Sequence, residues 1–146
     1  MKPKEKSFSA LVKEAAKEIP IKKGCCRHAF ADALSLESKF PDDAAKMICG
    51  EDFRCPSCAM NYIRGLFTVY GNVTSPEKAY HLEFSAETEE LCEALVSLLE
   101  KQGMIFHRAK RKGRFIAYIK DSEKIEDFNS SFYYDAPQNI LNAYLT

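Results

Sequence analysis

The chain has 146 residues, of which 46% are hydrophobic and 29% are charged. This length supports one hydrophobic core, and the apolar content excludes a fully disordered protein. No apolar run approaches the ~18 residues of a membrane-spanning helix, and the N-terminal segment lacks the apolar stretch of a secretory signal. The sequence therefore predicts a cytoplasmic protein without a membrane partner.

Three short helices are predicted before residue 50. The first follows Ser7 or Ser9, either of which can cap it, and its apolar residues form one stripe. The second starts at Cys25 and is rich in alanine, and Pro41 can open a brief third helix. We expect these helices at about residues 9–19, 25–36 and 42–49.

A longer fourth helix is predicted from Pro56, which suits a first helical turn, to Tyr70, with Gly71 as its stop. The segment NVTSPEK that follows has the composition of a turn, and AYHLEF alternates as a strand does. Ser85 is expected to cap a leucine-rich helix that ends at Gly103.

Two further strands, MIFHRAK and RFIAYIK, flank a hairpin turn at residues 111–113, and a last helix begins at Asp121. From Cys58 onward the order is helix, strand pair, helix, strand pair, helix, which predicts an α+β fold with an antiparallel sheet. We expect an N-terminal helical segment over residues 1–54 and a single α+β repeat over residues 55–146, together forming one compact domain.

The charges are unevenly distributed, although 21 basic and 21 acidic side chains balance. Residues 85–100 carry five acids and no base, whereas residues 101–120 carry seven bases and no acid. Lysines often protect an exposed strand edge from aggregation, but this number exceeds that need. Contacts with several phosphates would instead give salt-sensitive binding of nucleic acid. The predicted contacts are Lys78, Arg108, Lys110, Arg111, Lys112 and Arg114.

A glycine, Gly65, lies inside the fourth helix, where it costs ~1 kcal/mol relative to alanine. A second helix packed closely against it would explain that cost, and an ordinary core helix is the alternative. The chain resembles the second LAGLIDADG-type repeat of the WhiA family of bacterial sporulation and cell-division regulators in the stretch YIRGLFTVYGNVTSPEKAYHLEFSAETEELCEALVSLLEKQG and in RKGRFIAYIKDSEKIEDF. It resembles the start of the same family in SFSALVKEAAKEIPIKKGCCRHAFADAL.

This resemblance implies a homing-endonuclease-like fold. Two motif helices would pack in parallel through small residues, here Ala33 and Gly65, and curved sheets would form a saddle along duplex DNA. The first repeat is shortened to its helix in this sequence. Either two copies of the chain pair through the Gly65 helix as a homodimer, or the helix at residues 31–35 packs on it within one chain.

The resemblance also bears on catalysis. An active endonuclease of this fold has an acid at the eighth motif position, where this sequence has Tyr70 and, in the fainter first motif, Ser38. Neither side chain holds Mg²⁺ as a carboxylate would. We expect a nucleoid-associated DNA-binding regulator that is not an enzyme. A protein-interaction module is the alternative, and a metal-dependent endonuclease ranks last.

The chain contains six cysteines, which in a cytoplasmic protein favour metal ligands or buried thiols over disulfides. If the two motif helices are parallel, their first turns meet, and four cysteines there would suit a structural zinc ion. The predicted ligands are Cys55 and Cys58, Cys25 or Cys26, and Cys49 as the fourth, with His28 as its rival. The alternative is that these are small residues that fill a crowded helix junction.

Overall fold

The computed structural model describes residues 8–18, 20–74, 81–121, 123–125 and 128. The chain there forms, in order, α1 (Phe8–Glu18), α2 (Gly24–Ser35), the 3-10 turn η1 (Leu36–Ser38), α3 (Pro41–Cys49), α4 (Pro56–Tyr70), β1 (Gly71–Thr74), β2 (His81–Ala86), α5 (Glu89–Lys101), β3 (His107–Arg111) and β4 (Arg114–Ile119). Residues 123–125 and 128 are also helical, and the remainder of the expected last helix lies outside the described residues. None of the helices in the described ranges is long and apolar enough to cross a bilayer.

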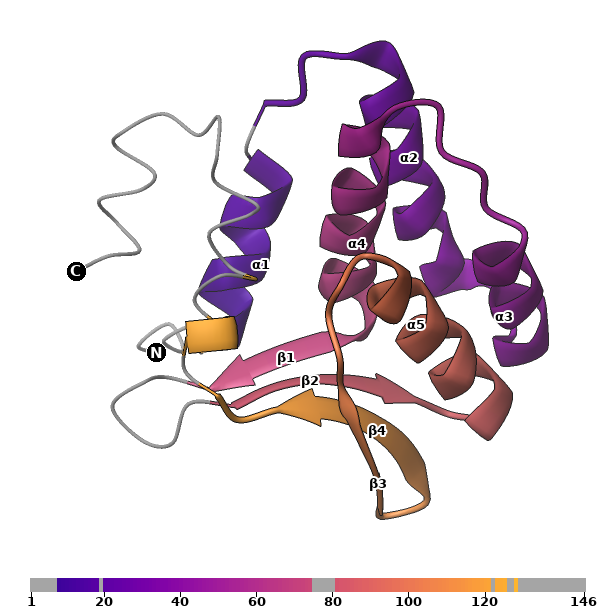
Figure 1. Cartoon of the computed structure of the whole chain (residues 1–146), viewed down its shortest axis with the longest axis vertical. Coiled ribbons are helices and arrows are strands. Elements are labelled where there is room, and N and C mark those ends of the chain that lie inside the picture. The colour runs from indigo at the N-terminus through magenta and orange to yellow at the C-terminus, as the bar shows by residue number, and fades with distance from the viewer. Residues whose placement is uncertain (1–7, 19, 75–80, 122, 126–127, 129–146) are drawn as a thin grey trace, which may run out of the picture.

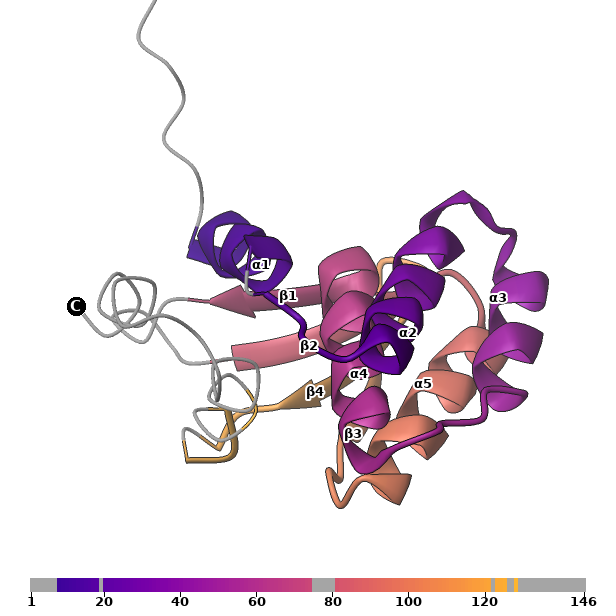
Figure 2. The same cartoon turned by 90° about the horizontal axis from the view of Figure 1, so that it is seen from above.

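The strands form one antiparallel sheet in the order β1-β2-β4-β3. The labelled helices lie on one side of this sheet, above it in the view of Figure 1. Seen from above, α1 lies over β1 at one end, and α3 lies beyond α2 and α5 at the other (Figure 2). We call the side of the sheet away from the helices the open face. The α+β class with an antiparallel sheet is thus confirmed.

Two local predictions are wrong. The start of NVTSPEK is not a turn, because Gly71–Thr74 pairs with β2 as an edge strand and buries Val73. Ser85 is not a helix cap, because β2 extends to Ala86 and the cap is Thr88, whose Oγ1 accepts a hydrogen bond from the Leu91 N–H at 3.2 Å. In both places, pairing within the sheet outweighs local sequence preference.

The core lies between the sheet and the helices. Alternation in β2 directs Leu82, Phe84 and Ala86 toward the helices, and each is at most 1% exposed. Four phenylalanine rings from α4, β2, the segment before β3 and the last helix meet edge to face, with centroid distances from 5.6 to 6.5 Å. They are Phe67, Phe84, Phe106 and Phe128.

Helices α2 and α4 approach closely through small residues. A β-carbon built on Gly65 would lie 2.5 Å from Ala33 Cβ and 2.9 Å from the carbonyl oxygen of Phe30. Only a residue without a side chain therefore fits at Gly65 without moving α2. This close contact lies within one chain. Helix α2 therefore covers the face of α4 that the expected homodimer would have used. A dimer would have to use a different surface.

Helix α1 protects the free edge of the sheet. Ser9 is 8% exposed, and its Oγ accepts a hydrogen bond from the N–H of Val73 in the edge strand β1 at 3.2 Å. A buried backbone N–H that loses its partner retains the full cost of its desolvation. This hydrogen bond therefore stabilises the packing of α1 against the sheet.

Replacement of Ser9 by alanine is expected to lower the free energy of unfolding by about 1–2 kcal/mol, because it leaves the Val73 N–H without its acceptor. Urea denaturation measures this loss, and Ser9→Thr, which keeps a hydroxyl oxygen, is the control. Equal stability of Ser9→Ala and the unmodified chain would show that another acceptor replaces the hydroxyl.

Candidate functional site

The most distinctive chemical feature is a cluster of four cysteines at the first turns of α2 and α4. Cys25 and Cys26 follow the first residue of α2, Cys55 precedes α4 and Cys58 lies in its first turn. The Sγ atoms are 3.7 Å apart for Cys25 and Cys55, 3.6 Å for Cys26 and Cys55, 3.9 Å for Cys26 and Cys58, and 3.4 Å for Cys55 and Cys58. All four sulfur atoms lie within 4.8 Å of one another. We call this group the thiol cluster.

The structure changes the predicted ligand set in one respect. Both Cys25 and Cys26 belong to the thiol cluster, and Cys49 does not. Cys49 is exposed at the end of α3, and the segment that connects α3 to α4 separates it from the first turn of α4. His28 lies one turn further along α2 than Cys25 and is also outside the cluster. The sequence alone could not identify the fourth ligand, because the path of the segment between α3 and α4 depends on tertiary packing.

The dimensions of the thiol cluster suit a tetrahedral metal ion. A zinc–sulfur bond of about 2.3 Å places the corners of a regular tetrahedron ~3.8 Å apart. Four of the six sulfur separations, from 3.4 to 3.9 Å, lie close to that value, and the other two are within 4.8 Å. Soft thiolate ligands in this arrangement favour zinc over magnesium or calcium. The cluster can therefore hold one zinc ion with little rearrangement.

The four thiols differ in acidity. Hydrogen bonding from the Cys58 thiol, more than any other influence, lowers the pKa of Cys55 to about 6, so Cys55 carries a thiolate at neutral pH. Burial raises the pKa of Cys26 to about 12. Metal binding would have to displace the proton of Cys26, whereas Cys55 offers its charge in advance.

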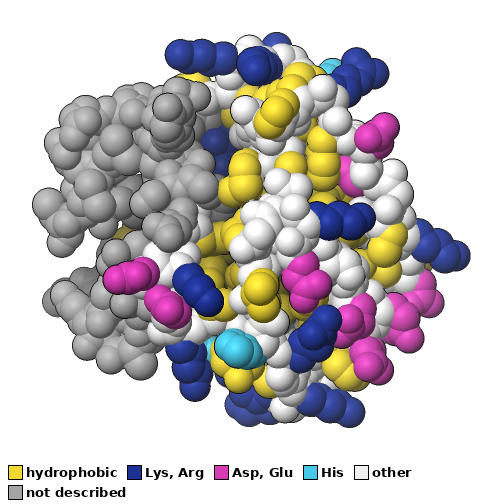
Figure 3. All heavy atoms as spheres, viewed as in Figure 1, with side chains coloured by type: hydrophobic (Ala, Val, Ile, Leu, Met, Phe, Trp, Pro, Cys, Tyr) yellow, Lys and Arg dark blue, Asp and Glu magenta, His cyan; other side chains and the backbone are white. Residues whose placement is uncertain are grey.

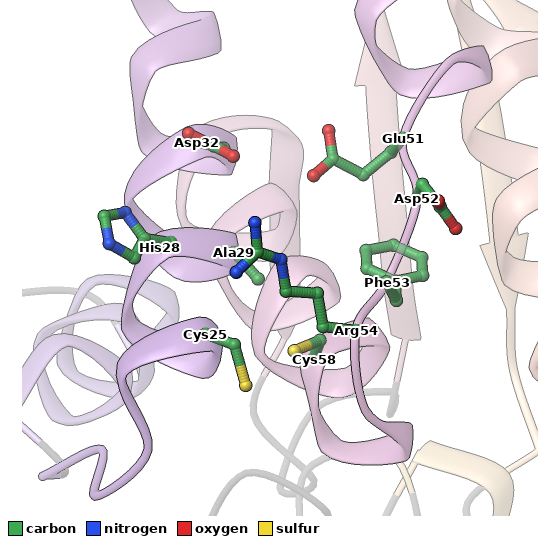
Figure 4. Close-up of a pocket in the computed structure, with 9 residues that line it drawn as sticks. All are labelled: Cys25, His28, Ala29, Asp32, Glu51, Asp52, Phe53, Arg54 and Cys58. Atoms are coloured by element: carbon green, nitrogen blue, oxygen red, sulfur yellow. The ribbon is translucent and has the colours of Figure 1, made fainter.

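A cavity of about 310 Å³ opens beside the thiol cluster. The sulfur atoms of Cys25 and Cys58 lie at one end of it, and Asp32 and Glu51 extend from opposite walls at the other (Figure 4). Burial, followed by the charge of Asp32, raises the pKa of Glu51. The Arg54 guanidinium lies between these groups in Figure 4. Solutes in this cavity can thus reach Cys25, which is partly exposed, whereas Cys58 is buried.

The structure divides the predicted DNA contacts between the two faces of the sheet. Arg108 and Lys110 share the helix side of β3, because they pair with Ala117 and Phe115, which also point toward the helices. Arg108 donates two hydrogen bonds to Glu93 of α5, at 2.6 and 3.0 Å. These two bases therefore do not face the same surface as the rest of the hairpin.

The other hairpin bases lie at the turn and on the open face. Lys112 and Gly113 both have positive φ, of 52° and 78°, which is the geometry of a tight two-residue hairpin turn. Arg114 donates from Nε to the Ser85 hydroxyl at 2.6 Å, and Arg111 donates to the Glu83 carboxylate at 2.7 Å. Lys78 lies outside the described residues.

Two open-face residues were missed by sequence reasoning. Glu83 is 5% exposed and its carboxylate contacts both Arg111 and the ring of His81, the latter at 2.9 Å. Its position between Leu82 and Phe84 was an available signal for an acid on the opposite face of that strand. Lys120 follows β4, and its Nζ lies 5.7 Å from the centre of the Tyr118 ring. Lys120 extends the basic surface beyond the hairpin.

The ends of the two motif helices line a second cavity, of about 490 Å³. Tyr70, at the end of α4, and Glu37 and Lys39, on either side of Ser38, contribute to its wall. Burial, with a smaller effect of Glu87, raises the pKa of Tyr70 to about 12, so the phenol stays protonated at neutral pH. Among the described residues, the acids of this cavity do not converge into a group of three metal ligands.

Comparison with known proteins places this arrangement in a family. The family model of the WhiA LAGLIDADG-like domain matches residues 59–132, about half of the chain. A probable cell division protein WhiA of Clostridium botulinum is 40% identical over 73 residues, which are 50% of this chain and 23% of the relative. That of Alkaliphilus metalliredigens is 30% identical over 96 residues, 66% of this chain and 28% of the relative. The chain thus matches only about a quarter of the length of these relatives.

Solved structures share the fold. The crystal structure of the N-terminal LAGLIDADG domain of DUF199/WhiA superposes with a TM-score of 0.65 at 16% identity and covers 90% of this chain and 95% of that one. The full-length DUF199/WhiA from Thermatoga maritima gives a TM-score of 0.63 at 14% identity, over 94% of this chain and 64% of that one. The sequence match and the shared fold together show that the chain belongs to the WhiA LAGLIDADG-like domain family.

Proposed function

We propose that this chain is a non-catalytic DNA-binding regulatory protein of the cytoplasm that contacts duplex DNA with the open face of its sheet. The observation that carries the proposal is the concentration of bases at the hairpin turn and on this face, at Lys112, Arg114 and Lys120. No carboxylate of a described residue pairs with these three side chains. In Figure 3, Lys and Arg side chains line the lower edge of the molecule, where the sheet lies, whereas acids gather on the right over α3 and α5.

In this proposal the remaining hairpin bases contact other side chains of the protein and do not contact DNA. Arg111 neutralises the buried Glu83 and positions the turn, so its net charge is largely compensated. Arg108 is paired with Glu93, and Lys110 stands over the Phe115 ring at 5.2 Å on the helix side. We therefore do not retain Arg108 and Lys110 as DNA contacts.

Charge reversal at two sites tests this division. The double variant Lys112→Glu/Arg114→Glu is expected to bind a fluorescein-labelled random duplex more than ~10-fold more weakly, and its affinity should depend less steeply on salt, because two phosphate contacts are lost. The matched control, Arg108→Glu/Lys110→Glu, changes the net charge equally and should weaken binding less than ~3-fold. Fluorescence anisotropy between ~50 and ~200 mM salt measures both.

Equal weakening by the two double variants would mean that net charge alone governs binding, and that the open face is not the contact surface. Absence of binding by the unmodified chain at low salt would support the alternative function, a protein-interaction module. The acidic surface of α3 and α5 favours a basic protein partner in that case; its exposed acids are Asp42, Asp43, Glu89, Glu90 and Glu100.

The molar mass of the DNA complex tests the homodimer, which we propose because one sheet supplies only half of a two-sheet saddle.

We further propose that the thiol cluster binds one structural zinc ion through Cys25, Cys26, Cys55 and Cys58. The tetrahedral spacing of the four sulfur atoms supports this assignment. When bound, the ion would join the first turns of α2 and α4, and it would supply no catalytic chemistry because all four of its positions are filled by protein. Metal analysis of protein purified without chelator should give close to one zinc per chain, and Cys49→Ser should leave this value unchanged.

A further inference from the structure

The pairing of the thiols across the helix junction has a chemical consequence. Cys25 with Cys55, at 3.7 Å, and Cys26 with Cys58, at 3.9 Å, form two pairs that use each cysteine once and each join α2 to α4. A disulfide bond is about 2.05 Å long, so each pair needs to close by less than ~2 Å. Both pairs can therefore form between helices that already lie side by side.

The alternative, one disulfide within each pair of cysteines close in sequence, fits disulfide geometry less well. Cys55 and Cys58 have the shortest sulfur separation, 3.4 Å, but their disulfide would leave Cys25 to pair with its neighbour Cys26. Adjacent residues have Cα atoms about 3.8 Å apart, whereas disulfides usually need 4.4–6.8 Å. A Cys25–Cys26 disulfide would consequently distort the first turn of α2. Only cross-helix pairings oxidise all four thiols without that distortion. The second such pairing would join Cys26 to Cys55, at 3.6 Å, and Cys25 to Cys58, within 4.8 Å.

Oxidants have a route to the thiol cluster. The cavity of about 310 Å³ ends on the sulfur atoms of Cys25 and Cys58 (Figure 4), and a water molecule occupies only ~30 Å³ of liquid. A molecule the size of hydrogen peroxide therefore reaches the partly exposed Cys25, whereas Cys58, which also lines the cavity, is 2% exposed. Five polar side chains, His28, Asp32, Glu51, Asp52 and Arg54, line the cavity beside the apolar Ala29 and Phe53, so a small hydrophilic oxidant finds hydrogen-bond partners there.

We propose that the thiol cluster is an oxidation site at which peroxides convert four cysteines into two disulfides, Cys25–Cys55 and Cys26–Cys58, that link α2 to α4. In each pair one thiolate attacks the O–O bond of hydrogen peroxide, which yields a sulfenic acid and a hydroxide that is protonated to water. The partner thiolate attacks that sulfur, forms the S–S bond and displaces a second hydroxide, which is also protonated. Two peroxides and four thiols thus give two disulfides and four waters. If zinc is bound, it is released.

The inference is independent of the proposed DNA binding, and it holds with or without zinc because the same four sulfur atoms react. Oxidation would affect one place in the fold, the junction of α2 and α4. The cross-links join the helix termini that the metal would join, so the junction stays closed after oxidation. The open face at the far end of α4 is not involved.

Tryptic peptides distinguish cross-helix disulfides from disulfides within one peptide, and the Cys25→Ser variant below distinguishes the two cross-helix pairings. Cleavage after Lys23 and Arg27 releases GCCR, and cleavage after Arg54 and Arg64 releases CPSCAMNYIR. The full chain is treated with a few equivalents of hydrogen peroxide, the remaining thiols are blocked with N-ethylmaleimide, and the digest is analysed by mass spectrometry without reduction. We expect one species that contains both peptides and is ~4 Da lighter than their sum. After reduction it should separate into the two peptides.

Two variants make the test sharper. Cys49→Ser removes a cysteine outside the thiol cluster and should leave the cross-linked species unchanged. Cys25→Ser should still join the two peptides, now through one disulfide between Cys26 and Cys58, with Cys55 blocked by the maleimide. Separate peptides with an internal Cys55–Cys58 disulfide, or masses that show sulfinic and sulfonic acids, would overturn the proposal. Zinc content is measured on the same sample, so failure of the zinc assignment is recognised separately.

Discussion

Replacement of Gly65 by alanine is expected to destabilise the chain by about 1–3 kcal/mol, although alanine is the better helix former. The added β-carbon would lie 2.5 Å from Ala33 Cβ and 2.9 Å from the Phe30 carbonyl oxygen, and the second of these is backbone that cannot rotate away. Helix α2 would have to move from α4, which would also separate the cysteines at the start of both helices. Thermal denaturation should show a fall in Tm of about 3–10 °C.

A matched control exists in the same pair of helices. A β-carbon on Gly24, the first residue of α2, would meet only the Arg27 guanidinium at 3.6 Å, an ordinary van der Waals contact, so Gly24→Ala should change stability by less than ~0.5 kcal/mol. Adding Ala33→Gly to Gly65→Ala should restore part of the loss, because it removes the nearer of the two contacts. An unchanged or higher Tm for Gly65→Ala would show that α2 and α4 are not packed through this residue.

The fold was largely predictable because its strongest signals are local. The helix from Pro56 to Tyr70 has a proline at its start and an apolar face, and both survive in the structure. A strand pair after this helix was expected, but the position of β1 was not predictable in this way, because Gly71–Thr74 has the composition of a turn and is a strand only through its pairing with β2. The same competition between local preference and sheet pairing moved the helix cap from Ser85 to Thr88.

The candidate site was predictable in its residue types and not in its geometry. The C-x2-C pair and the paired cysteines indicated the thiol cluster, but the exclusion of Cys49 depends on the path of a connection that no periodicity describes. Alternation placed Arg108 and Lys110 together on one face of β3. Which face it is depends on where α5 lies, and Glu93 of that helix draws Arg108 away from the open face. Sequence gives a strand its two sides, and tertiary packing decides which side meets the helices.

Removal of zinc is expected to have the largest effect on stability. Treatment with a strong zinc chelator should lower the free energy of unfolding by at least ~3 kcal/mol and Tm by about 10 °C, because four thiols held within 4.8 Å would lose the ion that joins α2 to α4. The loss should be smaller than the ~10–16 kcal/mol of zinc-finger peptides, which have almost no core. Differential scanning fluorimetry with and without chelator, followed by readdition of zinc, measures the change and its reversal.

The pH dependence of zinc binding and two cysteine substitutions distinguish metal binding from simple packing of the thiols. The pKa of Cys55 is lowered to about 6, so protons compete for this ligand increasingly as pH falls below that value, and zinc should be lost on acidification and retained as pH rises. Cys58→Ser should abolish the effect of chelator on Tm, whereas Cys49→Ser should preserve it, because Cys49 lies outside the thiol cluster. A Tm that is the same with and without chelator in the unmodified chain would mean that the four cysteines stabilise the junction by packing alone. In that case the small, well-fitted thiols would be the reason that two helices can approach so closely at their first turns, with Gly65 and Ala33 performing the same task further along.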